Sequence, residues 1–496
     1  MVKQTLDKDL GRIETIGTEA MHGSARYKAL ALAVLFLLIV WAFSASVTAA
    51  GEHSTLIIIA AIIGGYMALN IGANDVANNV GPAVGSRALT MFGALIIAAI
   101  FEAAGAILAG GDVVNTIQKG IINPASMQNS EVFIWAMMSA LFAAALWVNI
   151  ATWVGAPVST THAVVGGVMG AGIAAAGFSI VDWGTMSAIA ASWVISPIMG
   201  GAIAAIFLAF IKYNVIYKDD KVSASRRWVP LLVAIMAGVF SAYLVTKGLK
   251  RIWRPDAVTV FAISLAFFAG TYAIVKPVIH RASVGMENRN KSVRALFTIP
   301  LICSAALLSF AHGANDVANA VGPLAAIVET STSGAIDAKV GIPLWVMLIG
   351  AAGLSAGLFL FGPKLIRTVG EQITKMNPMR AYCVALSAGI TVLIASALGL
   401  PVSSTHIAVG AVFGVGFFRE WDTERRARKL RESLRDEKIH PDSNLPATEL
   451  DQSENRPKKL VRRSQLMTIV AAWVITVPSA ALLSAGIFLT VSYFAE

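Results

Sequence analysis

Residues Gly72–Pro82 read GANDVANNVGP and residues Gly313–Pro323 read GANDVANAVGP, so that ten of eleven positions are identical. Each copy lies deep inside an apolar run and carries one carboxylate, Asp75 in the first and Asp316 in the second. A carboxylate near the middle of a membrane costs about 2.5–3.5 kcal/mol even on the mildest scale. Two such carboxylates in matching motifs therefore predict two related halves that share a functional site.

Two further pairs of matching segments extend the repeat along the chain. Pro157–His162 (PVSTTH) matches Pro401–His406 (PVSSTH) at an offset of 244 residues, against 241 for the first pair. Trp193 and Trp473 each begin a third matching segment, at an offset of 280. The 36 extra residues coincide with a stretch at 419–463 that holds 13 Lys/Arg and 10 Asp/Glu. We therefore predict a charged hydrophilic insertion in the second half, after which the repeat resumes.

The composition is that of a membrane protein. Of 496 residues, 56% are hydrophobic and only 14% are charged, roughly half the charged share of a soluble domain. The net charge of +10 lies in short loops between apolar runs, where basic residues set topology, so nucleic acid is not an expected partner. Both cysteines, Cys303 and Cys383, lie inside apolar segments and do not indicate a disulfide framework. Soluble enzymes, nucleic-acid-binding modules and disordered scaffolds are excluded, and a multi-pass integral membrane protein is predicted.

The apolar runs have the length of membrane helices. They lack strand alternation, so helices are expected, and their many glycines and alanines allow close helix packing. We predict an all-α polytopic membrane protein with about twelve membrane segments in two repeats, some of them re-entrant helical hairpins. An inverted and a parallel relation of the repeats are both compatible with the apolar pattern. The predicted divisions are a polar tail at 1–28, a first transporter repeat at 29–212, a connecting region with an extra membrane helix at 213–257, a second repeat at 258–418, the insertion at 419–463 and a final helix at 464–496.

The two Asn-Asp motifs predict a cation site. No Lys or Arg lies within ten residues of Asp316, or within the ten residues before Asp75, so a bound cation is the natural counter-charge. Carboxylate and amide oxygens suit a hard cation. Positions i and i+4 share a helix face, so the two asparagines of each motif can point together. The amides belong to Asn74, Asn78, Asn315 and Asn319. A helix-end cap by Asn-Asp is the alternative, and it explains one copy better than two.

The two Pro-Val-Ser segments predict an anion site. Pro157 and Pro401 interrupt apolar runs and free backbone groups. Half-helices that begin after these prolines would direct their N–H groups and positive dipole ends at a bound anion. Hydroxyl groups add donors there, and they belong to Ser159, Thr160, Thr161, Ser403, Ser404 and Thr405. Ordinary N-capping is the alternative, but six hydroxyls in two matched clusters exceed what capping requires.

The two kinds of site complement each other. A small oxyanion bound without Lys or Arg needs co-bound cations to balance its charge, and neither ion is stable alone near the membrane midplane. Two repeats with matched interruptions, and a site between them, are typical of secondary transporters. The residues therefore predict symport of a small oxyanion with a cation.

The duplicated GANDVAN motif, together with PVSTTH and PVSSTH, resembles the inorganic phosphate transporter (PiT) family. The resemblance covers both halves, nearly all of the chain outside the N-terminal tail and the insertion. It implies an all-helical transporter with inverted repeats, re-entrant hairpins and usually a homodimer. It also implies uptake of inorganic phosphate coupled to sodium or protons, with sodium as the co-transported cation and no other cofactor. The cell inner (plasma) membrane is the expected location.

The resemblance assigns roles to matching residues of this chain. Phosphate would be bound by Asn74, Asp75, Ser159, Thr160, Thr161, Asn315, Asp316, Ser403, Ser404 and Thr405. Sodium would be coordinated by Asp75, Asn78, Asp316 and Asn319. Glu102, in Phe-Glu-Ala-Ala-Gly, also resembles a family position and is a candidate for coupling. Its rough counterpart in the second half is Ser355, so that any role of Glu102 is asymmetric.

Other polar residues in the apolar runs have simpler explanations. His162 and His406 could shuttle protons, but hydrogen-bonded histidines at helix starts are the simpler expectation. His312 precedes only the second motif, where the first has Ile71, so we expect no essential symmetric role for it. Packing or interface anchors are expected at the recurring tryptophans, Trp193 and Trp473.

Three other functions compete with phosphate symport. Another tetrahedral oxyanion, chiefly sulfate, could be the substrate, because hydroxyls and helix starts discriminate poorly between such ions. An intramembrane hydrolase could use Ser159, His162 and Asp75, but it would need one activated nucleophile with an oriented base, and two equivalent sets argue against it. A passive channel is the third alternative, which saturable uptake against a gradient would exclude.

Overall fold

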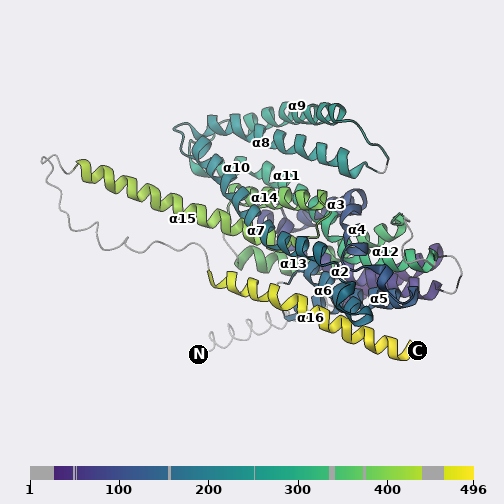
Figure 1. Cartoon of the computed structure of the whole chain (residues 1–496). Helices are drawn as coiled ribbons and strands as arrows, with labels where there is room; N and C mark the ends of the chain where they lie inside the picture. Colours follow the sequence, from purple (N-terminus) through teal and green to yellow (C-terminus); the bar gives the residue numbers. More distant parts are fainter. Residues whose placement is uncertain are drawn as a thin grey trace, which may run out of the picture.

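The computed structural model describes residues 27–48, 51, 53–154, 158–250, 252–333, 341–372, 376–437 and 463–495. In this part of the chain the regular elements are helices, and an isolated bridge pairs Ile122 with Val181. Eleven of the described helices are long and apolar enough to cross a membrane. The predicted all-α, multi-pass fold is confirmed (Figure 1). Most of the predicted polar tail, Pro157 and the later part of the insertion, 438–462, lie outside the described residues.

The helices follow the order that the repeat predicts. After a helix over Tyr27–Val47, the first half contains α2 (Ser54–Gly85), α3 (Met91–Ala109), α4 (Gly111–Lys119), α5 (Ser130–Val154), α6 (Thr160–Ala176) and α7 (Trp183–Ile211). The connecting region contains α8 (Lys221–Tyr243), α9 (Ala257–Ala282) and α10 (Asn290–Leu296). The second half contains α11 (Thr298–Asp316), α12 (Ala318–Ser333), α13 (Leu344–Gln372), α14 (Pro378–Ala397), α15 (Ser404–Glu437) and α16 (Arg463–Ala495).

Short polar side chains fix where several of these helices begin. Asp182, Asp220 and Asn377 precede α7, α8 and α14, and each accepts a hydrogen bond from the N–H three residues on, at 2.9–3.0 Å. Such caps satisfy one of the free N–H groups of the first turn. After α14, Gly399 turns the chain with a φ of 69°, a conformation that glycine adopts without strain. The turn leads directly into the PVSSTH segment and the start of α15.

The two halves interlock. α2 packs against α13 as α11 packs against α3, and α7 packs on α15 as α16 packs on α6. Each of these helices thus has a main partner in the other half, and each contact has a counterpart made by the corresponding pair. Matched contacts of this kind are expected for two repeats related by a two-fold axis. They bring the two GANDVAN segments and the starts of α6 and α15 together in the centre of the molecule.

The first glycine of each motif sets a close helix approach. A Cβ on Gly72 would lie 2.0 Å from the carbonyl oxygen of Leu354, and a Cβ on Gly313 would lie 2.0 Å from that of Glu102. Only glycine permits such backbone contacts between helices. Because the two contacts are equivalent, Leu354 occupies the place of Glu102 in the other half. The predicted pairing of Glu102 with Ser355 is therefore wrong by one residue, since the spacing from the motif to the partner helix differs between the halves.

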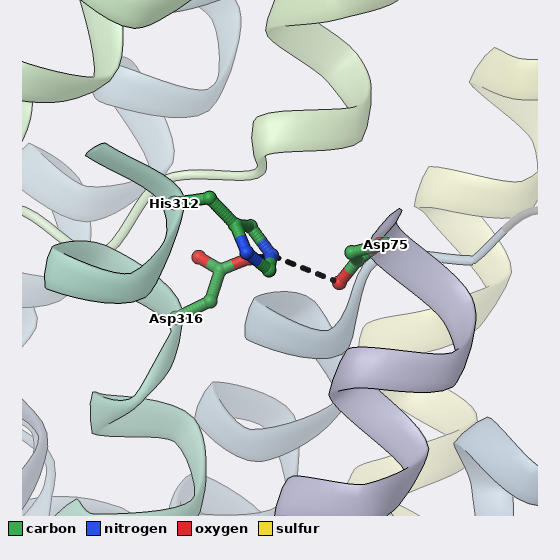
Figure 2. A group of neighbouring side chains, drawn as sticks. All are labelled: Asp75, His312 and Asp316. Atoms are coloured by element: carbon green, nitrogen blue, oxygen red, sulfur yellow. Dashed lines mark ion pairs between the residues drawn. The ribbon is translucent and has the colours of Figure 1, made fainter. Parts of the chain in front are cut away.

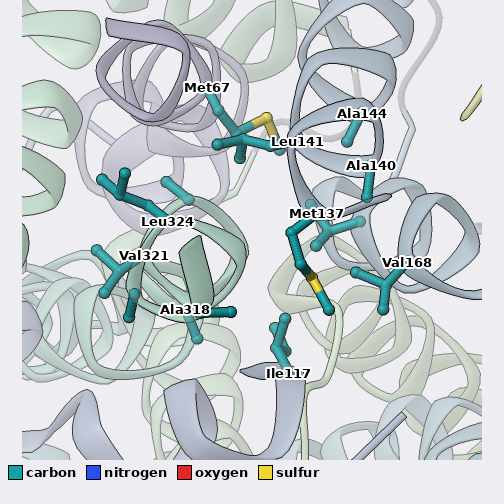
Figure 3. Close-up of a cluster of buried hydrophobic side chains, with 14 of the residues drawn as sticks. Met67, Ile117, Met137, Ala140, Leu141, Ala144, Val168, Ala318, Val321 and Leu324 are labelled. Atoms are coloured by element: carbon teal, nitrogen blue, oxygen red, sulfur yellow. The ribbon is translucent and has the colours of Figure 1, made fainter. Parts of the chain in front are cut away.

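Buried apolar side chains pack the hairpin of α5 and α6 against α2 and α12, and the hairpin of α14 and α15 is its counterpart in the second half. Met67 of α2, Met137 and Leu141 of α5, and Leu324 of α12 are at most 1% exposed and belong to one buried cluster (Figure 3). Figure 3 also shows Val168 of α6 facing the same group. The cluster joins segments from both repeats, so that the start of α6 is supported from two sides.

Two parts of the molecule lie at the edge of this core. α8 packs on α9 as a hairpin along one side (Figure 1). α15 runs without interruption from Ser404 to Glu437, and its charged end projects from the body. The predicted insertion at 419 therefore begins inside a helix, as a continuation of the half-helix that starts at the centre.

Candidate functional site

The two motif aspartates lie at the junction of the repeats. Asp75 is in the interior of α2, and Asp316 is the last residue of α11. Each is 1% exposed. The position of Asp75, far from either end of α2, removes the alternative that this residue is a helix cap. Figure 2 shows the two carboxylates facing a common space from different helices.

Neutral donors from both halves surround Asp75. Its Oδ1 accepts hydrogen bonds from Thr405 Oγ1 at 3.0 Å, from Asn74 Nδ2 at 3.3 Å and from Asn78 Nδ2 at 3.4 Å. Its Oδ2 accepts one from Thr160 Oγ1 at 3.2 Å. Charge-assisted hydrogen bonds of this kind stabilise an ionised carboxylate in a site without lysine or arginine.

Asp316 has a different set of neighbours. Its Oδ2 accepts a hydrogen bond from Ser404 Oγ at 3.1 Å and lies 3.0 Å from His312 Nε2. Its Oδ1 and the Oδ1 of Asn319 are buried, and neither accepts a hydrogen bond from the described part of the chain. Buried acceptor oxygens without donors are the chemical group that a hard cation binds.

The last asparagine of each GANDVAN motif donates a hydrogen bond to a hydroxyl of the other repeat. Asn78 Nδ2 donates to Thr405 Oγ1 at 2.8 Å, and Asn319 Nδ2 donates to Thr161 Oγ1 at 3.1 Å. Each repeat thus holds a hydroxyl from the hairpin of the other repeat. The cluster that the sequence places in two separate halves is therefore one site, built between them.

The first asparagine of each motif holds the backbone of its own hairpin. Asn74 Nδ2 donates to Val158 O at 3.2 Å. Asn315 Nδ2 donates to Leu400 O at 3.1 Å, and its Oδ1 accepts from Val402 N, also at 3.1 Å. These contacts fix the loop before each half-helix, so that both residues position the hydroxyl clusters in this structure.

The serines of the two hairpins act as helix caps. Ser159 Oγ accepts from His162 N at 3.2 Å, and Ser403 Oγ accepts from His406 N at 3.4 Å. The capping alternative thus describes these two hydroxyls. The four that follow bond to motif side chains or to the opposite hairpin, and they are Thr160, Thr161, Ser404 and Thr405.

His312 is the site residue whose importance the sequence did not reveal. Its side chain is fully buried, with Nε2 3.0 Å from Asp316 Oδ2 and 3.8 Å from Asp75 Oδ2, and Nδ1 3.3 Å from Glu102 Oε1. Asp75, His312 and Asp316 each bring a potential ligand atom within 4.8 Å of one another (Figure 2). The available signal was its position four residues before Asp316, on a helix with no other charged side chain before the motif, which places both on one face.

Asn79 completes the surroundings of Glu102. Its Nδ2 donates to Glu102 Oε1 at 2.7 Å, and both side chains are buried. The second motif has alanine at this position, Ala320, which is its one difference from the first. The difference follows from the packing, because Leu354 stands where the first half has Glu102, and an amide donor there would have no acceptor.

The histidines at the two half-helix starts meet at the repeat junction. The rings of His162 and His406 lie 4.7 Å apart, edge to face, and His162 also contacts the Trp193 ring at 3.8 Å. Trp193 Nε1 donates to Pro401 O at 3.1 Å, so this residue is an interface anchor between the halves. In the described part of the chain the His162 ring nitrogens form no hydrogen bond. The hydrogen bond of His162 is made by its backbone N–H, which donates to Ser159 Oγ, and the side-chain Ser159–His162 pair that a hydrolase needs is not formed.

Exposure within the site is unequal between the repeats. Three residues on the Asp75 side are partly exposed, and they are Asn74, Asn78 and Thr405. Their counterparts on the Asp316 side are at most 1% exposed, and they are Asn315, Asn319 and Thr161. The Asp75 side of the site is therefore less buried than the Asp316 side.

Known proteins resemble this chain over most of its length. A family model described as the phosphate transporter family matches residues 71–484. A Helicobacter pylori protein named "Putative phosphate permease" is 47% identical, over 94% of this chain and 95% of its own length. A similarly named protein of Pyrococcus abyssi is 34% identical, over 86% of this chain and 96% of its own. A solved structure described as "The sodium-dependent phosphate transporter" superposes with a TM-score of 0.77 at 35% identity, covering 88% of this chain and 99% of that one.

Proposed function

The chain belongs to the phosphate transporter family, and we propose that it is a secondary active symporter that moves inorganic phosphate together with sodium. One observation carries the proposal: two buried carboxylates and hydroxyl-bearing half-helix starts from both repeats form a single site. A site shared between two repeats is suited to alternating access, because it changes when one repeat moves against the other.

The carboxylates supply the cation side of the proposal. Asp75 and Asp316 offer negative charge at the centre of the site, and unpartnered oxygens of Asp316 and Asn319 are available as ligands. The solved relative is described as sodium-dependent, which favours sodium over protons as the coupling ion. In this proposal Asp75, Asn78, Asp316 and Asn319 coordinate sodium.

The half-helix starts supply the phosphate side. The hydroxyls of Thr160, Thr161, Ser404 and Thr405 stand in the first turns of α6 and α15, where free N–H groups favour an oxyanion. Protonated forms of phosphate can donate a hydrogen bond, which sulfate cannot do at neutral pH. Because Asp75 and Asp316 are acceptors beside these hydroxyls, the site favours phosphate over sulfate.

The unequal exposure supports a transport cycle. The partly exposed residues belong to one side of the junction, and their sequence equivalents on the other side are buried. If the two sides exchanged these environments, the site would become accessible from the other face of the membrane. A homodimer and a location in the cell inner membrane remain predictions from the family.

A gradient-swap uptake assay tests the proposal. The purified protein in proteoliposomes would be given radiolabelled phosphate with an inward sodium gradient, an inward proton gradient, or neither. We expect concentrative, saturable uptake with sodium, and weak competition by excess sulfate. Uptake driven only by protons would reject sodium coupling, uptake insensitive to both gradients would reject symport, and equal competition by sulfate would reject phosphate selectivity.

A further inference from the structure

Three helix ends, those of α7, α10 and α14, gather around the middle of α15, away from the central site. α14 and α15 form an antiparallel hairpin. Arg380 lies about 26 Å before the end of α14, and Arg419 lies about 23 Å after the start of α15, so the two residues are at nearly the same height along the hairpin. α10 lies beside α14, and the Phe297 ring that follows it is 5.6 Å from the Tyr382 ring. This contact places Arg294, one turn before Phe297, beside the start of α14.

α7 adds the third end. Lys212 follows α7 directly, and its Nζ lies 5.3 Å from the centre of the Phe418 ring, next to Arg419. The same Nζ is 2.6 Å from Asp422 Oδ2, in a salt bridge whose carboxylate is 2% exposed. The charge of Lys212 is therefore balanced by a carboxylate of α15.

The three arginines are not balanced in this way. None of Arg294, Arg380 and Arg419 forms a salt bridge with a residue that the structure describes. Arg380 and Arg419 are half-buried, and Arg294 is exposed. The charges of Arg294 and Arg419 act on Arg380, and that of Arg294 acts on Arg419, so the three guanidinium groups are neighbours. Burial, and then the neighbouring Arg294, lower the pKa of Arg419, while Glu420 acts in the other direction.

We propose that Arg294, Arg380 and Arg419 form a basic pocket between α10, α14 and α15 that binds the phosphate group of an anionic lipid. Guanidinium groups bind phosphate oxygens through paired, charge-assisted hydrogen bonds. Basic pockets between membrane helices, at the depth of the headgroups, have this ligand chemistry. The site is separate from the transport site, which contains no arginine, and it would hold the second hairpin at its outer end. Free inorganic phosphate shares the chemistry, so the experiment must separate the two sources.

Native mass spectrometry of the detergent-purified full chain tests the pocket. Phosphatidylglycerol or phosphatidylcholine would be added to the wild type, to Arg380→Gln/Arg419→Gln and to Arg294→Gln, with Arg428→Gln as the matched control. Arg428 is an exposed arginine further along α15, paired only with Glu432 at 3.7 Å. We expect phosphatidylglycerol adducts to fall about tenfold in the double variant, to fall less in Arg294→Gln, and to be unchanged in the control.

Each other outcome contradicts the proposal. Equal phosphatidylglycerol adducts on the wild type, Arg294→Gln and the double variant would place the lipid elsewhere. Equal binding of phosphatidylglycerol and phosphatidylcholine by the wild type would remove the charge-based explanation. Displacement of phosphatidylglycerol by millimolar inorganic phosphate would assign the pocket to the free ion. Arg294→Gln keeps the test valid if the double variant does not fold, because Arg294 is exposed.

Discussion

Next to Asp316, the described structure holds a buried polar group that consists of Asn79, Glu102 and His312. At the equivalent places next to Asp75, the chain has Ala320, Leu354 and Ile71, which are all buried and apolar. The equivalence follows from the motif alignment for the first and third residues and from the matching glycine contacts for the second. The two repeats therefore share a backbone frame but differ in chemistry at three linked positions.

The difference makes the two motif aspartates unequal. Asp75 is stabilised by hydroxyl and amide donors, whereas Asp316 lies against an imidazole that also contacts Glu102. The matching helices of the two repeats form a symmetric backbone around the site, which allows its accessibility to alternate between the two membrane faces. The imidazole of His312 lies 3.0 Å from Asp316 but 3.8 Å from Asp75, so substitutions on the two sides should have different effects.

The largest effect is expected from removal of either motif carboxylate. Asp75→Asn and Asp316→Asn keep the size of the side chain but remove the charge that attracts a cation, and we expect sodium-driven phosphate uptake to be lost in both. Asp220→Asn, which changes a helix-capping aspartate outside the site, is the matched control and should transport normally. Uptake near the wild-type rate in either motif variant, at equal protein levels, would refute the cation-site assignment.

The next largest effect is expected at His312. His312→Ile copies the residue of the other half and leaves Glu102 and Asp316 without their shared neighbour. Loss of a charge-assisted contact at a buried carboxylate costs about 1.5–3 kcal/mol, so uptake should fall by about 10- to 100-fold. Thermal stability of the purified protein should also fall.

A double variant sharpens this comparison. His312→Ile/Glu102→Leu copies both apolar partners of the first motif, Ile71 and Leu354, and removes the carboxylate that the single variant leaves unpaired. We expect the melting temperature to recover towards the wild type while uptake stays low. Additive loss of stability in the double variant would show that the two side chains do not act as a unit.

A smaller, unequal effect is expected for the hydroxyls that cross between repeats. Both hydroxyls accept a hydrogen bond from the motif asparagine of the other repeat. They differ in what they donate to, because Thr405 donates to the Asp75 carboxylate, whereas Thr161 donates to a backbone carbonyl. Thr405→Val should therefore raise the KM for phosphate by about tenfold, and Thr161→Val by about threefold. Thr152→Val, whose hydroxyl bonds within its own helix, should leave the KM unchanged. Equal effects of the two site variants would contradict the asymmetry.

The smallest effect is expected on thermal stability, from Asp422 near the beginning of the charged part of α15. Burial alone would raise the pKa of Asp422, but hydrogen bonds from Lys212 and Tyr217 outweigh it and lower the pKa below its ordinary value. A lowered pKa adds stability above the unfolded-state value of about 3.9, and this stability is lost as the pH falls through the folded value. Asp422→Asn should lower the melting temperature at pH 7 by about 1–2 °C and reduce its loss below pH 4. Glu424→Gln, an exposed change on the same helix, should do neither.

The sequence predicted the residues that the two repeats share better than those that only one repeat has. The repeated motifs and hairpins identified Asp75 and Asp316 and indicated a site between the halves, because a duplicated pattern marks matching positions. The same comparison discounted His312, which has no polar counterpart. It also paired Glu102 with Ser355, because the distance along the chain from motif to partner helix differs between halves. The capping role of Ser159 depends on hydrogen-bond geometry, which the residue pattern does not specify.

Sodium-dependent phosphate binding by the purified protein tests the central claim most directly. Binding of radiolabelled phosphate would be measured at equilibrium in sodium chloride and in choline chloride, for the wild type, Asp75→Asn and Asp316→Asn. If both repeats form one cation–phosphate site, sodium should lower the Kd of the wild type by about tenfold or more, and the dependence should disappear in both variants. Equal Kd values in the two salts for the wild type, or sodium dependence that persists in either variant, would contradict the account.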